Sequence, residues 1–137
     1  MVILLGKMHE LTNKQFTHLK IHTQYSICEG ALKTSDLAKY CKTNKIRAVG
    51  LCDSNNLCGA LEFSEFVAKS KTQPIIGTQI NIEYKGLSGK IPLFAKDLEG
   101  YKNLIKLSSK SFLEIKDNEE PHCKIVDIES NCKGLIL

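Results

Sequence analysis

The chain has 137 residues, of which 42% are hydrophobic and 25% are charged, and it contains 9 glycines and 3 prolines. This composition excludes a disordered chain, a collagen-like chain and a small disulfide scaffold, and the length suffices for one hydrophobic core but not for two full domains. The formal net charge of +4 is unevenly spread, since residues 1–48 carry eight Lys or Arg and three acids, whereas residues 49–137 carry eleven and twelve.

The first third of the chain predicts two strands around one helix. Residues Phe16–Ile21 alternate between apolar and polar side chains, which is typical of a strand with one buried face. After a loop, Thr34 or Ser35 is a suitable N-cap for a helix with an apolar stripe. The short apolar run Ala48–Cys52 indicates a buried parallel strand.

The rest of the chain continues the same alternation. We expect a helix over about Ala60–Ser70, a strand over Pro74–Ile82, and a glycine-containing turn that pairs Ile91–Ala95 back as a hairpin. A longer helix is predicted from Leu98, and Gly134–Leu137 is predicted as another buried strand. The apolar stripe expected along the longer helix consists of Tyr101, Leu104, Ile105, Ser108, Phe112 and Ile115.

Alternating strands and helices predict an α/β fold with a parallel sheet or barrel. In such folds the functional site lies at the carboxyl ends of the strands, in the loops that lead into the helices. Two loops occupy these positions, His22–Glu29 after the first strand and Asp53–Cys58 after the second.

Membrane and disulfide signals are weak in this chain. No run of about 18 apolar residues exists, and Val2–Leu5 is shorter than a signal-peptide core of roughly 7–15 residues, so we expect a cytoplasmic protein with no membrane partner. The six cysteines form no C-x-x-C pair and are predicted to be free, buried thiols, with a site that uses Cys52 and Cys58 as the alternative.

Several polar residues are predicted to meet at the strand ends. His18, Lys20 and His22 alternate on the first predicted strand and therefore share one face, while Asp53 follows the second strand and Gln79 lies on the third. A lysine ammonium repels a cation, and neither Ser54 nor Gln79 supplies charge, so this cluster is interpreted as a polar network with about two usable metal ligands. The structural alternatives are a hydrogen-bonded His22 and an Asp53 that orders its loop.

Four blocks of sequence carry a family resemblance. They are FTHLKIHTQYSICEGALKTSDL, AVGLCDSNNLCGALEF, PIIGTQINI and LFAKDLEGYKNLIKLSSKSF. In this order and spacing they resemble the PHP (polymerase and histidinol phosphatase) domain at the start of bacterial DNA polymerase III alpha subunits. The resemblance covers residues 16–137 and implies a parallel β/α barrel-like PHP fold, incomplete and comprising roughly the first half of the domain, with residues 1–15 as an N-terminal extension.

The resemblance implies that three metal-ligand positions are retained. The family's His-x-His pair aligns with Lys20 and His22, so that only its second member is a histidine here. The family's acidic residue before glycine is matched by Glu29, and the aspartate of its Thr-Asp-His block is matched by Asp53.

The remaining ligand positions are lost in the same alignment. Lys20 and Ser54 stand where the family has histidines, and Gln79 stands where it has a glutamate. Lys90 matches a histidine often found before the family's Leu-Leu-Ala-Lys segment. The resemblance therefore implies a vestigial cluster of His22, Glu29 and Asp53 that holds no metal and uses no cofactor.

The resemblance also implies a function and partners. The parent would be a DNA-directed DNA polymerase, a nucleotidyltransferase of chromosomal DNA replication, whose catalytic carboxylates lie beyond residue 137. This segment would be a non-catalytic scaffold that docks the proofreading exonuclease subunit, with the rest of the alpha chain and, through the holoenzyme, DNA as its other partners. The alternative is a metal-dependent phosphoesterase or 3′–5′ exonuclease with a reduced metal centre.

The basic first third leaves a further alternative open. Lys39, Lys42, Lys45 and Arg47 are interpreted as the solvent-exposed face of a helix and the turn after it. An element that contacts the phosphates of DNA directly is the second interpretation of the same residues.

Overall fold

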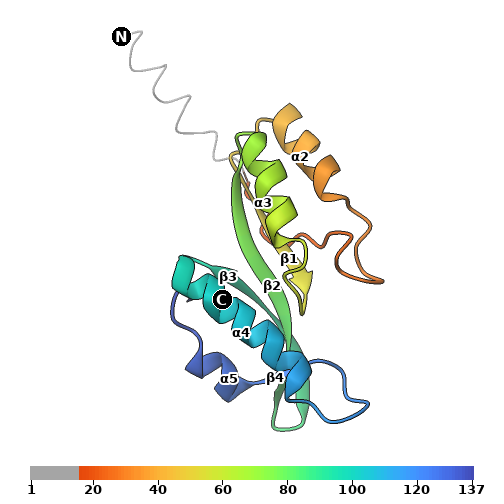
Figure 1. Ribbon diagram of the computed structural model, residues 1–137, viewed down its shortest axis with the longest axis vertical. Coiled ribbons are helices and arrows are strands. Elements are labelled where there is room, and N and C mark those ends of the chain that lie inside the picture. Colours follow the sequence, from red (N-terminus) through yellow and green to blue (C-terminus); the bar gives the residue numbers. More distant parts are fainter. Residues whose placement is uncertain (1–15) are drawn as a thin grey trace.

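The computed structural model describes residues 16–137, in which helices cover a five-stranded sheet (Figure 1). The strands are β1 (Ala48–Ser54), β2 (Gln73–Tyr84), β3 (Leu87–Ala95), β4 (Cys123–Lys124) and β5 (Leu135–Ile136). The helices are α2 (Thr34–Thr43), α3 (Ala60–Lys69), α4 (Leu98–Leu113) and α5 (Ile125–Ser130). These bounds confirm the α/β class and the predicted alternation from α2 to α4, but the strand predicted at residues 16–21 is absent, and the sequence predicted neither β4 nor α5.

The long strand β2 organises the sheet. Its first half pairs in parallel with β1, from Ala48 opposite Gln73 to Ser54 opposite Gln79, and its second half pairs in parallel with the short β4. Along its other edge β2 pairs antiparallel with β3, which in turn pairs antiparallel with β5. The sheet is therefore mixed: the antiparallel β2–β3 pairing is the predicted hairpin, whereas the antiparallel β3–β5 pairing departs from the expected parallel sheet.

The hairpin between β2 and β3 explains the mixed sheet. Lys85 and Gly86 join the two strands, with φ of 51° and 76° respectively. Two central residues with positive φ are typical of a tight hairpin turn, which can only connect antiparallel strands. At the other end of β3, the predicted terminal strand shrinks to Leu135 and Ile136, and Ile136 is half exposed rather than buried.

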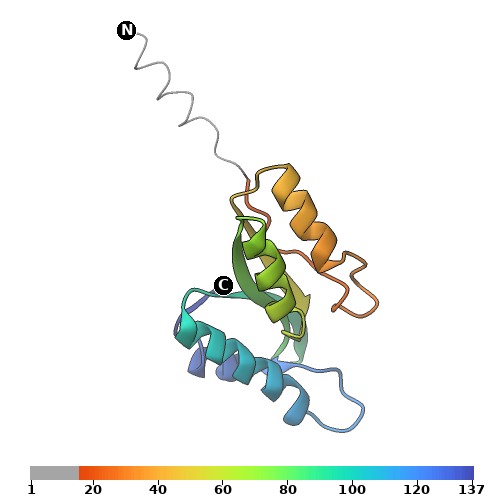
Figure 2. The same cartoon turned by 45° about the horizontal axis from the view of Figure 1, so that its top comes forward.

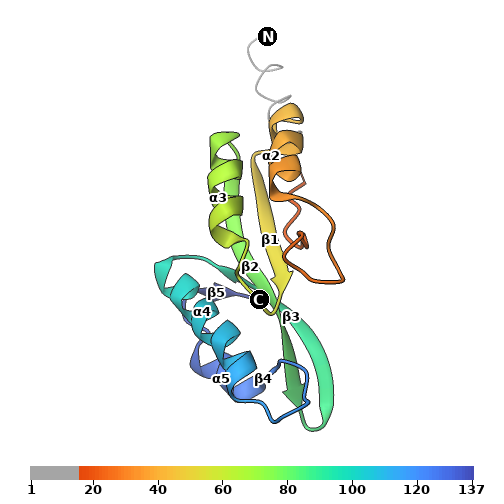
Figure 3. The ribbon, with the colours of Figure 1, turned by 45° about the vertical axis from the view of Figure 1, so that its right-hand side comes forward.

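Two hydrophobic clusters hold the helices on the sheet. The first joins α2 and α3 to β1 through side chains such as Leu37, Leu51 and Phe63. The second joins α4 and α5 to β2 and β3 through residues such as Ile80 and Leu104. Figure 2 shows α4 lying apart from α2 and α3, and Figure 3 shows α2 and α3 side by side. No helix in the described residues is long and apolar enough to cross a bilayer.

The segment before the first loop departs from its predicted strand. His18 and Ile21 accept hydrogen bonds from the backbone N–H groups of Gly50 and Cys52, both at 2.8 Å, so the segment lies along β1. The two acceptors are three residues apart, whereas the two donors are two residues apart. This extra residue prevents a regular ladder, and residues 16–21 contain no assigned strand.

Gly50 allows this close approach. A Cβ at this position would lie 2.4 Å from the carbonyl oxygen of Leu19 and 2.7 Å from its Cα. Because both contacts are with backbone, Gly50→Ala is expected to lower the free energy of unfolding by about 1–3 kcal/mol, as overpacking does elsewhere. Urea denaturation measures this change. The matched control is Gly89→Ala on β3, whose Cβ would meet only the Ile82 side chain at 3.7 Å, and an equal loss in both variants would contradict the explanation.

Candidate functional site

Three segments meet beyond the carboxyl end of β1. They are the loop of residues 22–29, the last two residues of β1 (Asp53 and Ser54), and the neighbouring part of the β2–β3 hairpin. Ser54 lies opposite Gln79 in the ladder, and Lys90 lies opposite Asn81 on β3. Most residues of the predicted cluster are thus brought to one end of β1.

Asp53 is the fully buried centre of this site. Its carboxylate accepts hydrogen bonds from the backbone N–H of Thr23 at 2.6 Å and from the Thr23 hydroxyl at 2.8 Å. A third bond comes from the Ser26 hydroxyl at 2.6 Å. These donors belong to a loop 30 residues earlier in the chain, so Asp53 orders the first loop rather than its own. Both carboxylate oxygens are occupied by protein donors.

The Ser26 hydroxyl connects Asp53 to its neighbours. Besides donating to Asp53, its oxygen accepts a bond from the backbone N–H of Ser54 at 3.2 Å. The Nδ1 atom of His22 lies 3.3 Å from the same oxygen. Ser26 therefore ties the loop of residues 22–29 to the end of β1.

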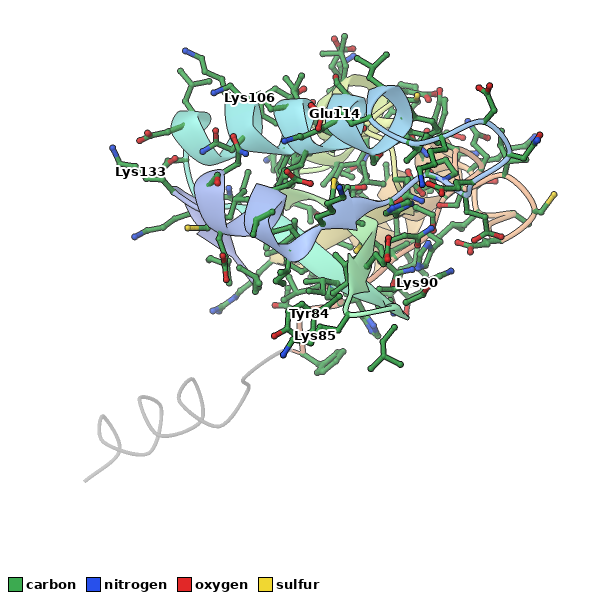
Figure 4. All side chains as sticks on the ribbon, turned by 90° about the horizontal axis from the view of Figure 1, so that it is seen from below. Tyr84, Lys85, Lys90, Lys106, Glu114 and Lys133 are labelled. Atoms are coloured by element: carbon green, nitrogen blue, oxygen red, sulfur yellow. The ribbon has the colours of Figure 1, made fainter. Side chains whose placement is uncertain are left out.

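Glu29 lies at the exposed edge of the site and is held by two donors. The Ser54 hydroxyl donates to Oε2, and the Lys90 ammonium donates to Oε1 at 3.1 Å. His22 Nδ1 is 3.6 Å from Oε2. The hydrogen bond from Ser54 and then the one from Lys90 lower the pKa of the Glu29 carboxyl below its ordinary value. Figure 4 labels Lys90, which reaches this site from the β2–β3 hairpin.

The lowered pKa of Glu29 predicts a pH dependence of stability. A carboxyl whose pKa is lower in the folded state stabilises the fold above its ordinary pKa of 4.5, and this stabilisation disappears as the pH falls through the lowered value. Glu29→Gln is therefore expected to lower the melting temperature at neutral pH, with the difference shrinking below pH 4.5.

Thermal melts of both proteins across this pH range measure the effect. The matched control is Glu65→Gln, because the one ion pair that this carboxylate forms within residues 16–137 is with the exposed Lys69 ammonium, at 3.9 Å. A Glu29→Gln difference that persists unchanged at low pH would contradict the role assigned to the ionised carboxylate.

Three predicted members of the cluster, Lys20, Gln79 and His18, lie outside the hydrogen-bond network of Asp53 and Glu29. The Lys20 side chain is exposed, and within residues 16–137 it shows no hydrogen bond or ion pair to His22, Glu29 or Asp53. The cation that does pair with Glu29 is Lys90. Gln79 is buried, and its Oε1 atom has no hydrogen-bond partner in this part of the chain. His18 is exposed, with its ring against that of Phe16 at 4.6 Å.

The donor set does not fit a bound metal ion. A divalent cation needs carboxylate oxygens and neutral imidazoles with open lone pairs. Here the oxygens of Asp53 accept three protein hydrogen bonds, and those of Glu29 face a serine hydroxyl and a lysine ammonium. Across residues 16–137, no group of three or more His, Cys, Asp or Glu side chains is arranged to hold a metal.

The alternative cysteine site is not assembled either. All six cysteines lie in the described residues and form no disulfide, but only three are buried, which corrects the prediction that all are. Cys52 is buried on β1, where burial raises the pKa of its thiol to about 11, whereas Cys58 is exposed in the following loop. A thiol of this kind is a packing residue rather than a nucleophile.

Sequence reasoning missed the residues that fill the site. Thr23 supplies two of the three bonds to Asp53, and Ser26 connects three parts of the site. The sequence does carry one signal for them: Thr23, Tyr25 and Ser26 place three hydroxyl groups shortly after His22, in a loop expected to face Asp53 at the end of the next strand. Lys90 was aligned with a family histidine, and it is the one lysine within hydrogen-bond distance of Glu29 in the described chain.

The arrangement is that of an α/β protein with polar loops at one end of a sheet, and a solved structure shares it. A crystal structure from Bifidobacterium adolescentis, described as a metal-dependent phosphoesterase, superimposes with a TM-score of 0.58 at 17% identity. The match covers 72% of this chain and 33% of that chain, and it shows a common fold. Residues 18–137 also match the PHP domain family model, and the chain belongs to this family.

Three curated relatives from different bacteria bear the same name. Proteins named DNA polymerase III subunit alpha are 38% identical over 123 residues in Rickettsia bellii and 34% identical over 140 residues in Caulobacter vibrioides. The protein of this name from Helicobacter pylori is 42% identical over 110 residues. These matches cover 89%, 95% and 74% of this chain but only 10%, 12% and 9% of the relatives, so the chain spans about a tenth of their length.

Proposed function

We propose that this chain acts as part of a DNA polymerase III alpha subunit, in which it is a non-catalytic PHP scaffold. The relatives' shared name supports the parent protein, a cytoplasmic nucleotidyltransferase of DNA replication. The sheet would form part of a larger, barrel-like PHP sheet, which the partial coverage of the Bifidobacterium chain supports. No residue of this chain is assigned to the polymerase reaction.

The observation that carries the non-catalytic role is the ion pair between Lys90 and Glu29. It places a positive charge 3.1 Å from a carboxylate that metal binding would require. Such a charge opposes a cation directly, and both carboxylate oxygens of the buried Asp53 already accept hydrogen bonds from Thr23 or Ser26. In this proposal the polar side chains order the loop of residues 22–29 and do not serve as metal ligands.

In this proposal the ordered loops position the domain against its partners. These partners are the rest of the alpha chain, the proofreading exonuclease subunit and, through the holoenzyme, DNA. The test compares the full-length alpha chain with a form that lacks residues 16–137. We expect the exonuclease to co-elute with the first and not with the second. Equal co-elution with both forms would contradict the docking role.

A hydrolysis assay separates this proposal from a metal-dependent phosphoesterase or 3′–5′ exonuclease. The full chain is incubated with Mn²⁺ or Zn²⁺ and either an aryl phosphodiester or 3′-labelled single-stranded DNA. We expect no turnover above the buffer control. Hydrolysis that is abolished by Asp53→Asn and Glu29→Gln would overturn the scaffold and establish a reduced metal centre.

A further inference from the structure

A second charged region lies at the opposite ends of β1 and β2, away from the candidate site. There a pocket of about 510 Å³ opens where α2 leads into β1 and α3 leads into β2. We call it the basic pocket. Apart from Ile46 and Ser70, its described lining consists of cations only, namely Lys42, Lys45, Arg47, Lys69 and Lys71.

Two distant stretches of sequence form the basic pocket because β1 and β2 are parallel neighbours. Each strand begins at the same edge of the sheet, and each is preceded by a helix that ends there, at the upper end of Figure 3. The turns are joined by bonds from Gln73 N–H to the Arg47 carbonyl at 2.8 Å and from the Thr72 hydroxyl to the Ile46 carbonyl at 2.9 Å. The fold thereby adds the charges of Lys69 and Lys71 to those of the basic first third.

Both helices end in the same way, with a lysine in the left-handed conformation. After α2, the backbone N–H of Lys45 bonds to Lys42 and that of Ile46 to Cys41. After α3, the N–H of Lys71 bonds to Ala68 and that of Thr72 to Val67. These are two Schellman motifs, in which the residue with positive φ is usually glycine.

Lys45 and Lys71 occupy the glycine positions, with φ of 52° and 59°. A side chain in this conformation is strained relative to glycine. The negative ends of the helix dipoles explain lysines in the last turns, such as Lys42 and Lys69. They do not require a lysine at the strained position after each helix, and both of these lysines line the basic pocket.

We propose that the basic pocket binds the sugar–phosphate backbone of nucleic acid. Its described lining contains no acid, and the one ion pair among these lysines, Lys69 with Glu65, is exposed and 3.9 Å long. The lining also contains no aromatic side chain on which a base could stack, so the contacts are with phosphates and do not depend on base sequence. This inference goes beyond the scaffold role and does not depend on it.

The test uses substitutions that separate charge from stability. Lys45→Gly and Lys71→Gly each remove one positive charge and relieve one strained backbone. We expect the melting temperature to rise by about 2–6 °C in each variant while affinity for DNA falls. The matched control is Lys85→Gly, which makes the same change at a φ of 51° in the β2–β3 turn labelled in Figure 4. It lies at the far end of the 12-residue strand β2, roughly 35 Å from the basic pocket.

Binding is measured by fluorescence anisotropy of the full chain with a labelled DNA duplex at several salt concentrations. With the four lysines of the lining as phosphate contacts, affinity is expected to fall about 150-fold from about 50 to about 200 mM salt, and only about 12-fold with the two left in Lys45→Gly/Lys71→Gly. Lys85→Gly and the charge-preserving Lys45→Arg/Lys71→Arg should keep the steeper dependence.

Three results would overturn the proposal. They are an unchanged salt dependence in Lys45→Gly/Lys71→Gly, an equal loss of affinity in Lys85→Gly, and displacement of the duplex by poly-glutamate at the same charge concentration. The last result would assign the basic pocket to an acidic protein partner instead of nucleic acid.

Discussion

Replacing Asp53 with alanine is expected to lower the free energy of unfolding by about 3–5 kcal/mol. The substitution leaves the backbone N–H and hydroxyl of Thr23 and the hydroxyl of Ser26 without their acceptor in a fully buried place. Because a domain of this size is stable by only about 5–15 kcal/mol, a large part of its stability depends on this one carboxylate. Urea denaturation measures the loss.

Two further variants keep this prediction testable if Asp53→Ala does not fold. Thr23→Val removes the hydroxyl bond to Asp53 and the bond that this hydroxyl accepts from the Tyr25 N–H, and it should cost about 1.5–3 kcal/mol, less than Asp53→Ala because the backbone bond to Asp53 remains. The control Asp36→Ala removes a carboxylate on the exposed face of α2 that pairs with Lys39 at 3.1 Å, and it should change stability by less than about 0.5 kcal/mol. Similar losses for Asp53 and Asp36 would mean that the buried bonds do not hold the loop.

Restoring the family's ligands is expected to produce a large gain in metal affinity. The variant combines Lys20→His, Ser54→His, Gln79→Glu and Lys90→His, which supplies imidazoles and a carboxylate and removes the cation from Glu29. Affinity for Mn²⁺ in the full-length protein should rise at least about 10–100-fold. This is the change in metal affinity that typically follows mutation of a residue that only hydrogen-bonds a metal ligand, so restoring the ligands themselves should have at least this effect. Isothermal titration calorimetry measures the change.

The effect of Lys90 is measured by comparing this variant with a second one that carries the other three substitutions and keeps lysine at position 90. We expect it to gain less, because the ammonium still occupies Oε1 of Glu29. If neither variant binds metal more tightly than the parent, the four positions do not converge on one site, and the alignment of Lys20 in particular would be wrong.

The fold was predictable wherever the signal is local. The glycines after Tyr84 predicted the β2–β3 hairpin, and the strand at Ala48–Cys52 and the helix from Leu98 lie where their patterns place them. The segment Phe16–Ile21 shows the limit of this reasoning. Its alternation is that of a strand, but the extra residue in its pairing with β1 is visible only once both partners are in place.

In helix α4, the pattern of apolar residues does not predict the buried face correctly, because some of the buried residues are polar. Phe112 was predicted on the buried face and is 51% exposed, whereas Ser111 and Asn103 are buried. Both polar side chains find backbone acceptors, Ser111 at the Ser108 carbonyl and Asn103 at the Lys133 carbonyl, each at 2.8 Å. A hydrogen bond to a partner 30 residues away leaves no periodic signal in the sequence.

The position of the candidate site could be predicted from the sequence, but the contacts between its side chains could not. The carboxyl ends of neighbouring strands meet by the geometry of any such sheet, so Asp53 and Gln79 were expected near one another. Which cation neutralises Glu29 depends on the register of the β2–β3 hairpin. That register brings Lys90 to the site, while Lys20 stays exposed to solvent.

The most direct test of the central claim is a calorimetric titration of the full chain with Mn²⁺ and with Zn²⁺. The claim is that the protein itself already occupies the carboxylates of Asp53 and Glu29. We therefore expect no sub-micromolar binding of either ion, with the same weak heats in the parent and in Glu29→Gln. Sub-micromolar binding that Asp53→Asn or Glu29→Gln abolishes would contradict the claim and show that this cluster is a working metal centre.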